Sequence, residues 1–153
     1  MIYNLRGYII IPICIICCIL TYIIYNSWNK PIAIDNNHYK NYSSLLKYGI
    51  DECNIENGKA FISGWAISDK SIKSNVADAA QVFLLIGNKT YQLKTRSRKR
   101  VDVAKFYSLP DTFNHSGFYA SAYLPELNNY DKKTVIIIKG LEKNKSGFKY
   151  DCK

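Results

Sequence analysis

The apolar residues near the start of the chain form one uninterrupted run, YIIIPICIICCILTYIIY, from Tyr8 to Tyr25. No charged residue lies between Arg6 and Lys30, and the run lacks the polar stripe of a buried soluble helix. About 20 such residues span the ~30 Å hydrocarbon core of a bilayer. Residues 8–28 are therefore predicted to form one transmembrane helix that follows a short cytoplasmic N-terminus, residues 1–7.

The alternative for this segment is a cleaved signal peptide. The run is long for such a signal, and Asn26 to Lys30 lack the small residues that a signal peptidase requires. Cys14, Cys17 and Cys18 likewise lack the small residues that precede a lipobox cysteine. The sequence therefore favours an uncleaved signal anchor.

After the helix the hydrophobic pattern changes twice. Residues 29–48 are polar and rich in asparagine, which indicates a juxtamembrane connector, with one patch compatible with a helix at 42–48. From Gly49 onward, short segments of alternating or apolar character are separated by turn signals such as Asn57-Gly58. The predicted strands are 51–56, 60–67, 81–86, 90–95, 117–124, 134–139 and 147–152. Seven strands in about a hundred residues predict that 49–153 is an all-β sandwich, interrupted by a helical turn or two at 101–107.

Two cysteines bracket this predicted domain, Cys53 near its start and Cys152 at its end. A disulfide between them requires an oxidising compartment; the alternative is a pair of free thiols. Positive charges flank the helix almost equally, so the cysteines decide the predicted orientation, with the domain outside the cytoplasm. The expected location is the bacterial inner membrane, with a single pass and a periplasmic domain.

Several short motifs occur in a recognisable order, namely Gly64-Trp65-Ala66, Arg100-x-Asp102-Val103 and Ser116-Gly117-Phe118. This order resembles an immunoglobulin-like accessory module found beside bacterial glycosyltransferase domains and in other surface-polysaccharide proteins. The resemblance covers residues 50–152 and implies an immunoglobulin-like sandwich in a cell-envelope setting. It transfers no activity, because the module is expected to be accompanied by a membrane anchor and not by a transferase domain.

The motif residues also have predicted structural roles. Trp65 is expected to be an anchor of the core, and Gly64 a bulge or a site of close approach. Asp102 is placed to cap the short helix, with Arg100 pairing with it or with a carbonyl. Gly117 is expected to adopt a positive φ. Phe118 opens the strand that follows.

No catalytic or metal-binding pattern is evident. His38 and His115 have no cysteine, aspartate or second histidine at ligand spacing, and Asp51 and Glu52 are adjacent on a predicted strand, so they face opposite ways. No phosphate loop or nucleophile motif occurs. The sequence therefore predicts a non-enzymatic protein with no cofactor and no metal.

The chain is basic, with a formal net charge of +9, and its densest basic segment is Lys94-Thr95-Arg96-Ser97-Arg98-Lys99-Arg100. Alternation would place Lys94, Arg96 and Arg98 on one face of a strand, where they could bind carboxylates or phosphates together with Lys99 and Arg100. The alternative is a solvated edge strand whose charges deter association.

Two functions fit these features. The first is an accessory or binding module of cell-envelope polysaccharide assembly or modification, with membrane lipid and an acidic glycan as partners. The second is an interaction protein, such as a phage- or plasmid-encoded exclusion or immunity factor that acts on a membrane partner. Nucleic acid is not an expected partner, because the predicted compartment excludes it.

Overall fold

The computed structural model describes residues 3–34, 46–74, 78–130, 133–140 and 145–152. The chain forms two compact units, Met1–Lys30 and Pro31–Lys153. The first unit holds one long helix, α1 (Tyr3–Asn29), with Pro12 inside it. Its segment Ile10–Ser27 has a mean hydropathy of 2.1 and is long and apolar enough to cross a membrane.

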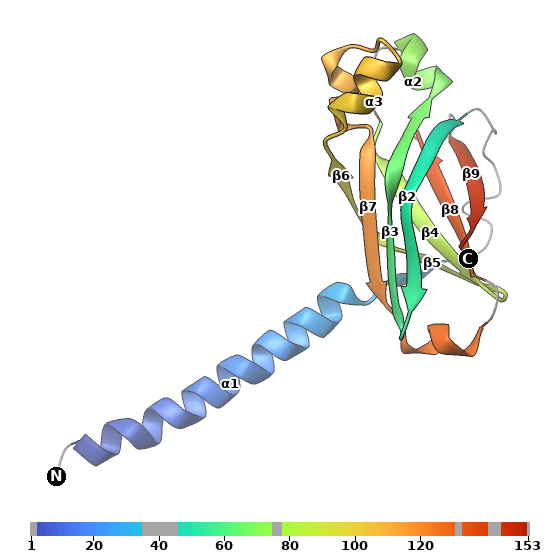
Figure 1. The fold of residues 1–153 in the computed structure, drawn as a ribbon. Helices are drawn as coiled ribbons and strands as arrows, with labels where there is room; N and C mark the ends of the chain where they lie inside the picture. The colour runs from blue at the N-terminus through green and yellow to red at the C-terminus, as the bar shows by residue number, and fades with distance from the viewer. Residues whose placement is uncertain (1–2, 35–45, 75–77, 131–132, 141–144, 153) are drawn as a thin grey trace. The chain divides into compact units, whose positions relative to one another are not determined.

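The second unit is mostly β-structure arranged in two antiparallel sheets (Figure 1). The described residues contain nine strands, where the sequence pattern predicted seven. They are β1 (Ile32–Ile34), β2 (Leu46–Glu56), β3 (Lys59–Ser68), β4 (Ala80–Ile86), β5 (Lys89–Gln92), β6 (Lys94–Arg98), β7 (Gly117–Tyr123), β8 (Lys133–Lys139) and β9 (Ser146–Asp151).

The two extra strands have separate origins. β1 lies in the stretch predicted as a connector, 29–48, so the domain begins earlier than its predicted start at Gly49. The segment predicted as one strand, 90–95, is split by Leu93 into β5 and β6, which belong to different sheets. Of the helix-compatible patch, residues 46–48 lie in β2, and the rest falls outside the described residues.

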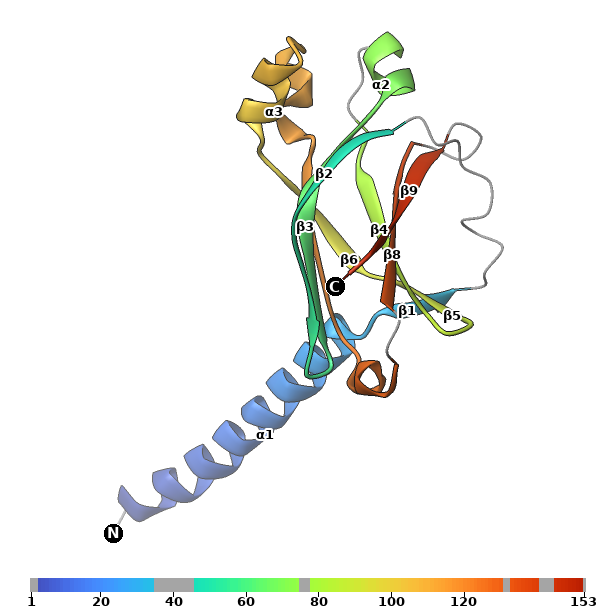
Figure 2. The same ribbon diagram turned by 45° about the vertical axis from the view of Figure 1, so that its right-hand side comes forward.

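One sheet has the order β1-β5-β4-β8-β9 and the other β2-β3-β7-β6. Figure 2 shows the two sheets facing each other. Residues from both sheets share one core, which includes Ile62 and Phe118 from one sheet and Leu84 and Ile137 from the other. Phe118 is therefore a core residue with no exposed surface.

Short helices occupy the connections between strands. α3 (Val101–Phe106) confirms the predicted helical turns, and it packs with η1 (Asp111–His115). α2 (Asp69–Ser74) and η2 (Pro125–Asn129) were not predicted. The predicted hairpin turn at Asn57-Gly58 is confirmed, because both residues have positive φ, as a type I′ turn requires.

The predicted disulfide is present. Cys53 on β2 and Cys152, directly after β9, are joined with their Cα atoms 5.7 Å apart. β2 and β9 are the edge strands of the two sheets, so the bond links the sheets along one side. Cys14, Cys17 and Cys18 in α1 are free.

Candidate functional site

The outward face of the sheet β2-β3-β7-β6 is the most distinctive surface of the domain. The strand register aligns its outward residues in rows, two of which cross all four strands and one of which crosses three. One row is Glu52, Ser63, Tyr119 and Arg96, and the next is Asn54, Phe61, Ser121 and Lys94. A third row, near the η2 end, is Glu56, Lys59 and Tyr123. We call these three rows the open face.

Aromatic side chains follow the two central strands of the open face. Phe61 is 37% exposed and Tyr123 is 49% exposed, while Tyr119 is half-buried. Phe61 lies opposite Ser121, so both tyrosines are its diagonal neighbours, with Cβ atoms about 7–8 Å away. The three rings form an aromatic ridge along the sheet, and such exposed rings are typical of binding surfaces.

The predicted basic ladder lies at the edge of the same sheet. Lys94, Arg96 and Arg98 pair with Ser121, Tyr119 and Gly117, so all three occupy one face, as alternation predicted. Arg96 and Arg98 are exposed and form no ion pair among the described residues; Lys99 follows them and is also exposed. Desolvation, and secondarily the charge of Arg96, lower the pKa of the half-buried Lys94.

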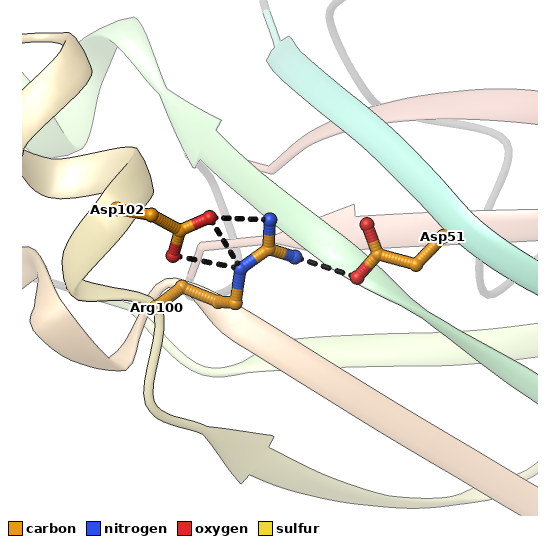
Figure 3. Close-up of polar contacts among 3 residues, drawn as sticks. All are labelled: Asp51, Arg100 and Asp102. Atoms are coloured by element: carbon orange, nitrogen blue, oxygen red, sulfur yellow. Dashed lines mark hydrogen bonds and ion pairs between the residues drawn. The ribbon is translucent and has the colours of Figure 1, made fainter.

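Arg100 does not belong to this ladder. Its side chain is only 17% exposed, and its guanidinium donates to Asp51 at 2.6 Å and to Asp102 at 2.8–3.1 Å (Figure 3). These contacts raise the pKa of Arg100, mainly through the hydrogen bonds to Asp102. Because both neighbouring carboxylates already engage the guanidinium, Arg100 is a structural clamp between β2 and α3.

The predicted pairing of Arg100 with Asp102 is confirmed, but Asp102 does not occupy the predicted N-cap position. The N-cap position of α3 is Arg100, which makes no side-chain capping bond, and Asp102 lies in the first turn. Its carboxylate receives the Arg100 guanidinium, which lowers the pKa of Asp102 to about 2. Asp51 reaches the clamp because it is the extra residue of a β-bulge between Ile50 and Glu52.

The glycines of the resemblance make room for this arrangement. Gly117 does not have the predicted positive φ. A Cβ there would lie 2.5 Å from Cγ of Arg100 and 2.8 Å from the carbonyl oxygen of Arg98. Gly64 lies opposite the bulge, where a Cβ would collide with the carbonyl oxygen of Gly49, so the predicted close approach is found.

Trp65 is not in the main core, contrary to the prediction. It is half-buried on the outward face and packs on a second cluster, formed by Ile67, Val103, Ala104 and Phe113. The Tyr107 ring lies beside it, with centroids 5.7 Å apart. α3 and η1 therefore cover the Trp65 end of the sheet and leave the open face beyond it.

Sequence reasoning missed the acidic edge of the open face. Glu52 and Glu56 are exposed on β2, the edge opposite to the basic strand. Alternation within 51–56 places Glu52 and Glu56 on the same face of a strand. Whether that face points outward depends on the bulge at Asp51, which the sequence did not indicate. The aromatic ridge was missed because its members come from two strands 58 residues or more apart in sequence.

Potential metal ligands are scattered over the described residues. These residues contain no group of three or more His, Cys, Asp or Glu side chains placed to hold a metal ion. His115 is exposed at the end of η1, and His38 lies outside the described residues. A comparison of the chain with protein-family models, with curated proteins and with solved structures found no match.

Proposed function

We propose that this protein is a membrane-anchored, non-enzymatic binding module of cell-envelope polysaccharide assembly or modification. α1 anchors it once in the bacterial inner membrane, and the disulfide-linked domain lies in the periplasm. Its ligand is an acidic glycan that binds the open face. The observation that carries this proposal is the aromatic ridge beside exposed arginines that form no ion pair among the described residues.

The strand order supports an immunoglobulin-like sandwich. If β2 to β9 are lettered A, B, C, C′, D, E, F and G in chain order, the sheets become A-B-E-D and C′-C-F-G. β1 extends the second sheet beyond C′. The resemblance to the accessory module gains support from the contacts among its motifs, because Ala66 donates from its amide to the Ser116 carbonyl at 3.1 Å and Gly117 accommodates Arg100.

The chemistry of the open face fits an acidic polysaccharide. The apolar faces of sugar rings pack on aromatic rings, and guanidinium groups bind carboxylates through two parallel hydrogen bonds. Arg96 and Tyr119 are direct cross-strand neighbours, with Cβ atoms about 5 Å apart. One sugar unit can therefore contact a ring and a cation at once.

Binding of polygalacturonate, a linear uronic-acid polymer, by the full chain in phosphatidylcholine nanodiscs tests this function. We expect binding that weakens with salt, because ~0.1 M salt screens exposed charges beyond about 10 Å. The double variant Arg96→Gln/Arg98→Gln should bind weakly, and Phe61→Ala should weaken binding without changing its dependence on salt. Lys149→Gln, an exposed lysine on β9 of the other sheet, is the matched control. Equal binding by the double variant would refute the proposed site.

A second candidate is the interaction protein that acts on a membrane partner. Phe106 favours it, because this side chain of α3 is 81% exposed and lies outside the open face. A large exposed ring is a common anchor residue in protein–protein interfaces. Loss of partner capture by Phe106→Ala, with polygalacturonate binding unchanged, would support this function over the first.

A further inference from the structure

The open face carries opposite charges at its two edges. β6 contributes Lys94 and Arg96, while β2, three strands away, contributes Glu52 and Glu56. Glu52 and Arg96 belong to the same row but are separated by β3 and β7. Among the described residues neither of these two forms an ion pair.

On the open face, the outward side chains of the two central strands, β3 and β7, are complementary in size. Within each row, one of them carries an aromatic ring and the other a smaller or flexible side chain. The pairs are Ser63 with Tyr119, Phe61 with Ser121, and Lys59 with Tyr123; Ser63 is only 3% exposed, so it forms the floor of its row.

We propose that the open face binds the open face of a second copy of this chain, about a two-fold axis parallel to the strands. Such an axis places β6 of one copy over β2 of the other and β7 over β3, with every row unchanged. Arg96 then faces Glu52 of the second copy, twice. In the central strands, Tyr119 faces Ser63, Phe61 faces Ser121, and Tyr123 faces Lys59. Packed sheets keep their strands within about 30° of each other, which this arrangement allows.

The alternative two-fold axis in the plane of the face is excluded by charge. An axis perpendicular to the strands would place β6 over β6 and β2 over β2. Arginine would then face the basic strand of the second copy, and like charges placed together cost affinity. Only the parallel axis makes the face self-complementary, as a two-fold interface must be.

The size of the contact indicates weak association. Four strands at about 4.8 Å and three rows at about 6.6 Å cover roughly 400 Å² per copy, about half of a standard interface. Such a contact can be displaced by a ligand. If the proposed function is correct, the dimer covers the glycan site, and acidic glycan and a second copy compete for Arg96. By linkage, glycan must then dissociate the dimer.

Energy transfer between donor- and acceptor-labelled full chains in phosphatidylcholine vesicles tests the dimer. Glu52→Arg alone and Arg96→Glu alone should each reduce self-association about tenfold or more, because each creates two like-charge pairs. A mixture of the two variants should recover wild-type transfer, since each contact then joins opposite charges. Recovery on mixing also shows that both variants are folded. Lys149→Glu should behave as wild type.

Two outcomes would overturn the dimer: wild-type transfer by both single variants, or no recovery in their mixture. Addition of polygalacturonate then tests the dimer and the proposed function independently of each other. Glu52→Arg keeps the basic strand, so it should bind the polymer as a monomer, whereas wild-type transfer should fall as polymer is added. Recovery on mixing without any polymer binding would retain the dimer and reject the glycan; polymer binding without recovery would do the reverse.

Discussion

The Arg100 guanidinium lies between the carboxylates of Asp51 and Asp102, and the aliphatic part of the Arg100 side chain passes over Gly117, where no side chain is present. Arg100, Asp102 and Gly117 belong to the motifs recognised in the sequence, and Arg100 was also predicted to bind a ligand. Their contacts explain why the motif needs an arginine, an aspartate two residues later and a glycine beyond them. The neighbouring exposed residues, Arg96 and Arg98, have no such contacts among the described residues.

Arg100→Ala should therefore destabilise the domain, while Arg98→Ala should not. The clamp is partly exposed, so we expect a loss of about 1–2 kcal/mol in the free energy of unfolding. Thermal unfolding of the full chain in detergent, followed by circular dichroism, measures it. Equal melting temperatures for the two variants would show that the clamp contributes nothing.

Lys139 is a second residue whose role the sequence did not indicate. It is 2% exposed between the two sheets, and its Nζ donates to the carbonyl oxygen of Ala66 at 2.8 Å. Desolvation lowers its pKa to about 8, although the charge of Asp78 opposes the shift. The folded domain therefore releases this proton more easily than the unfolded chain does.

This shift predicts that stability increases with pH. Between pH 8 and 10.5 the unfolded chain still binds the proton that folded Lys139 has lost, so the free energy of unfolding should rise by about 2–3 kcal/mol. Above pH 10 the effect of Tyr91 opposes this rise, since burial raises the pKa of that phenol to about 12. Unfolding measured from pH 7 to 10 should show the rise in the wild type and not in Lys139→Met. A flat wild-type profile would contradict this account.

At the scale of elements, the single residue Leu93 transfers the chain from one sheet to the other. Its side chain is buried in the shared core, and its amide donates to the Val82 carbonyl at 2.9 Å. The Thr95 hydroxyl accepts from the Val82 amide at 3.2 Å and donates to the Leu93 carbonyl at 3.1 Å. One hydroxyl therefore satisfies the backbone where the ladder is broken.

Removal of the Thr95 hydroxyl should destabilise the domain, because this hydroxyl supports the point where the chain passes from β5 to β6. Thr95→Val keeps the shape of the side chain but leaves the amide of Val82 without its acceptor, which should cost about 1–3 kcal/mol. Thr95→Ser keeps the hydroxyl and is the control, with a much smaller loss expected. Denaturant unfolding compares them; equal losses would show that the bond to Val82 is unimportant.

The sequence predicted elements better than it predicted their partners. Alternation, turn residues and the apolar run gave α1, the hairpin at Asn57-Gly58 and most strands. The division at Leu93 was not predictable, because a change of sheet leaves the alternation of 90–95 intact. β1 was missed because three residues are too few for a period to be recognised.

The arrangement of the candidate site residues was likewise predicted only in part. The common face of Lys94, Arg96 and Arg98 follows from the period of a strand and was predicted. The separation of Arg100 from them depends on Asp51, which a bulge directs toward it from another strand. The sequence around Arg100 does not indicate this contact, because Asp51 lies 49 residues away.

At the scale of the whole domain, the two sheets are joined along both sides. Leu93 joins them on one side through the chain itself, and Cys53–Cys152 joins the edge strands β2 and β9 on the other. The bond spans a sequence separation of 99 residues, and a loop of that length is worth up to about 4.7 kcal/mol in the chain-entropy account. The domain is therefore suited to an oxidising compartment.

In the proposed function, one membrane helix holds the disulfide-linked domain outside the cytoplasm. The direct measurement is labelling of intact cells with a membrane-impermeant maleimide, after the outer membrane has been permeabilised and with Cys14, Cys17 and Cys18 replaced by alanine. Cys53 and Cys152 should be labelled only after treatment with an impermeant reductant, with the inner membrane intact. Labelling without reductant, or only after lysis of the inner membrane, would contradict the account.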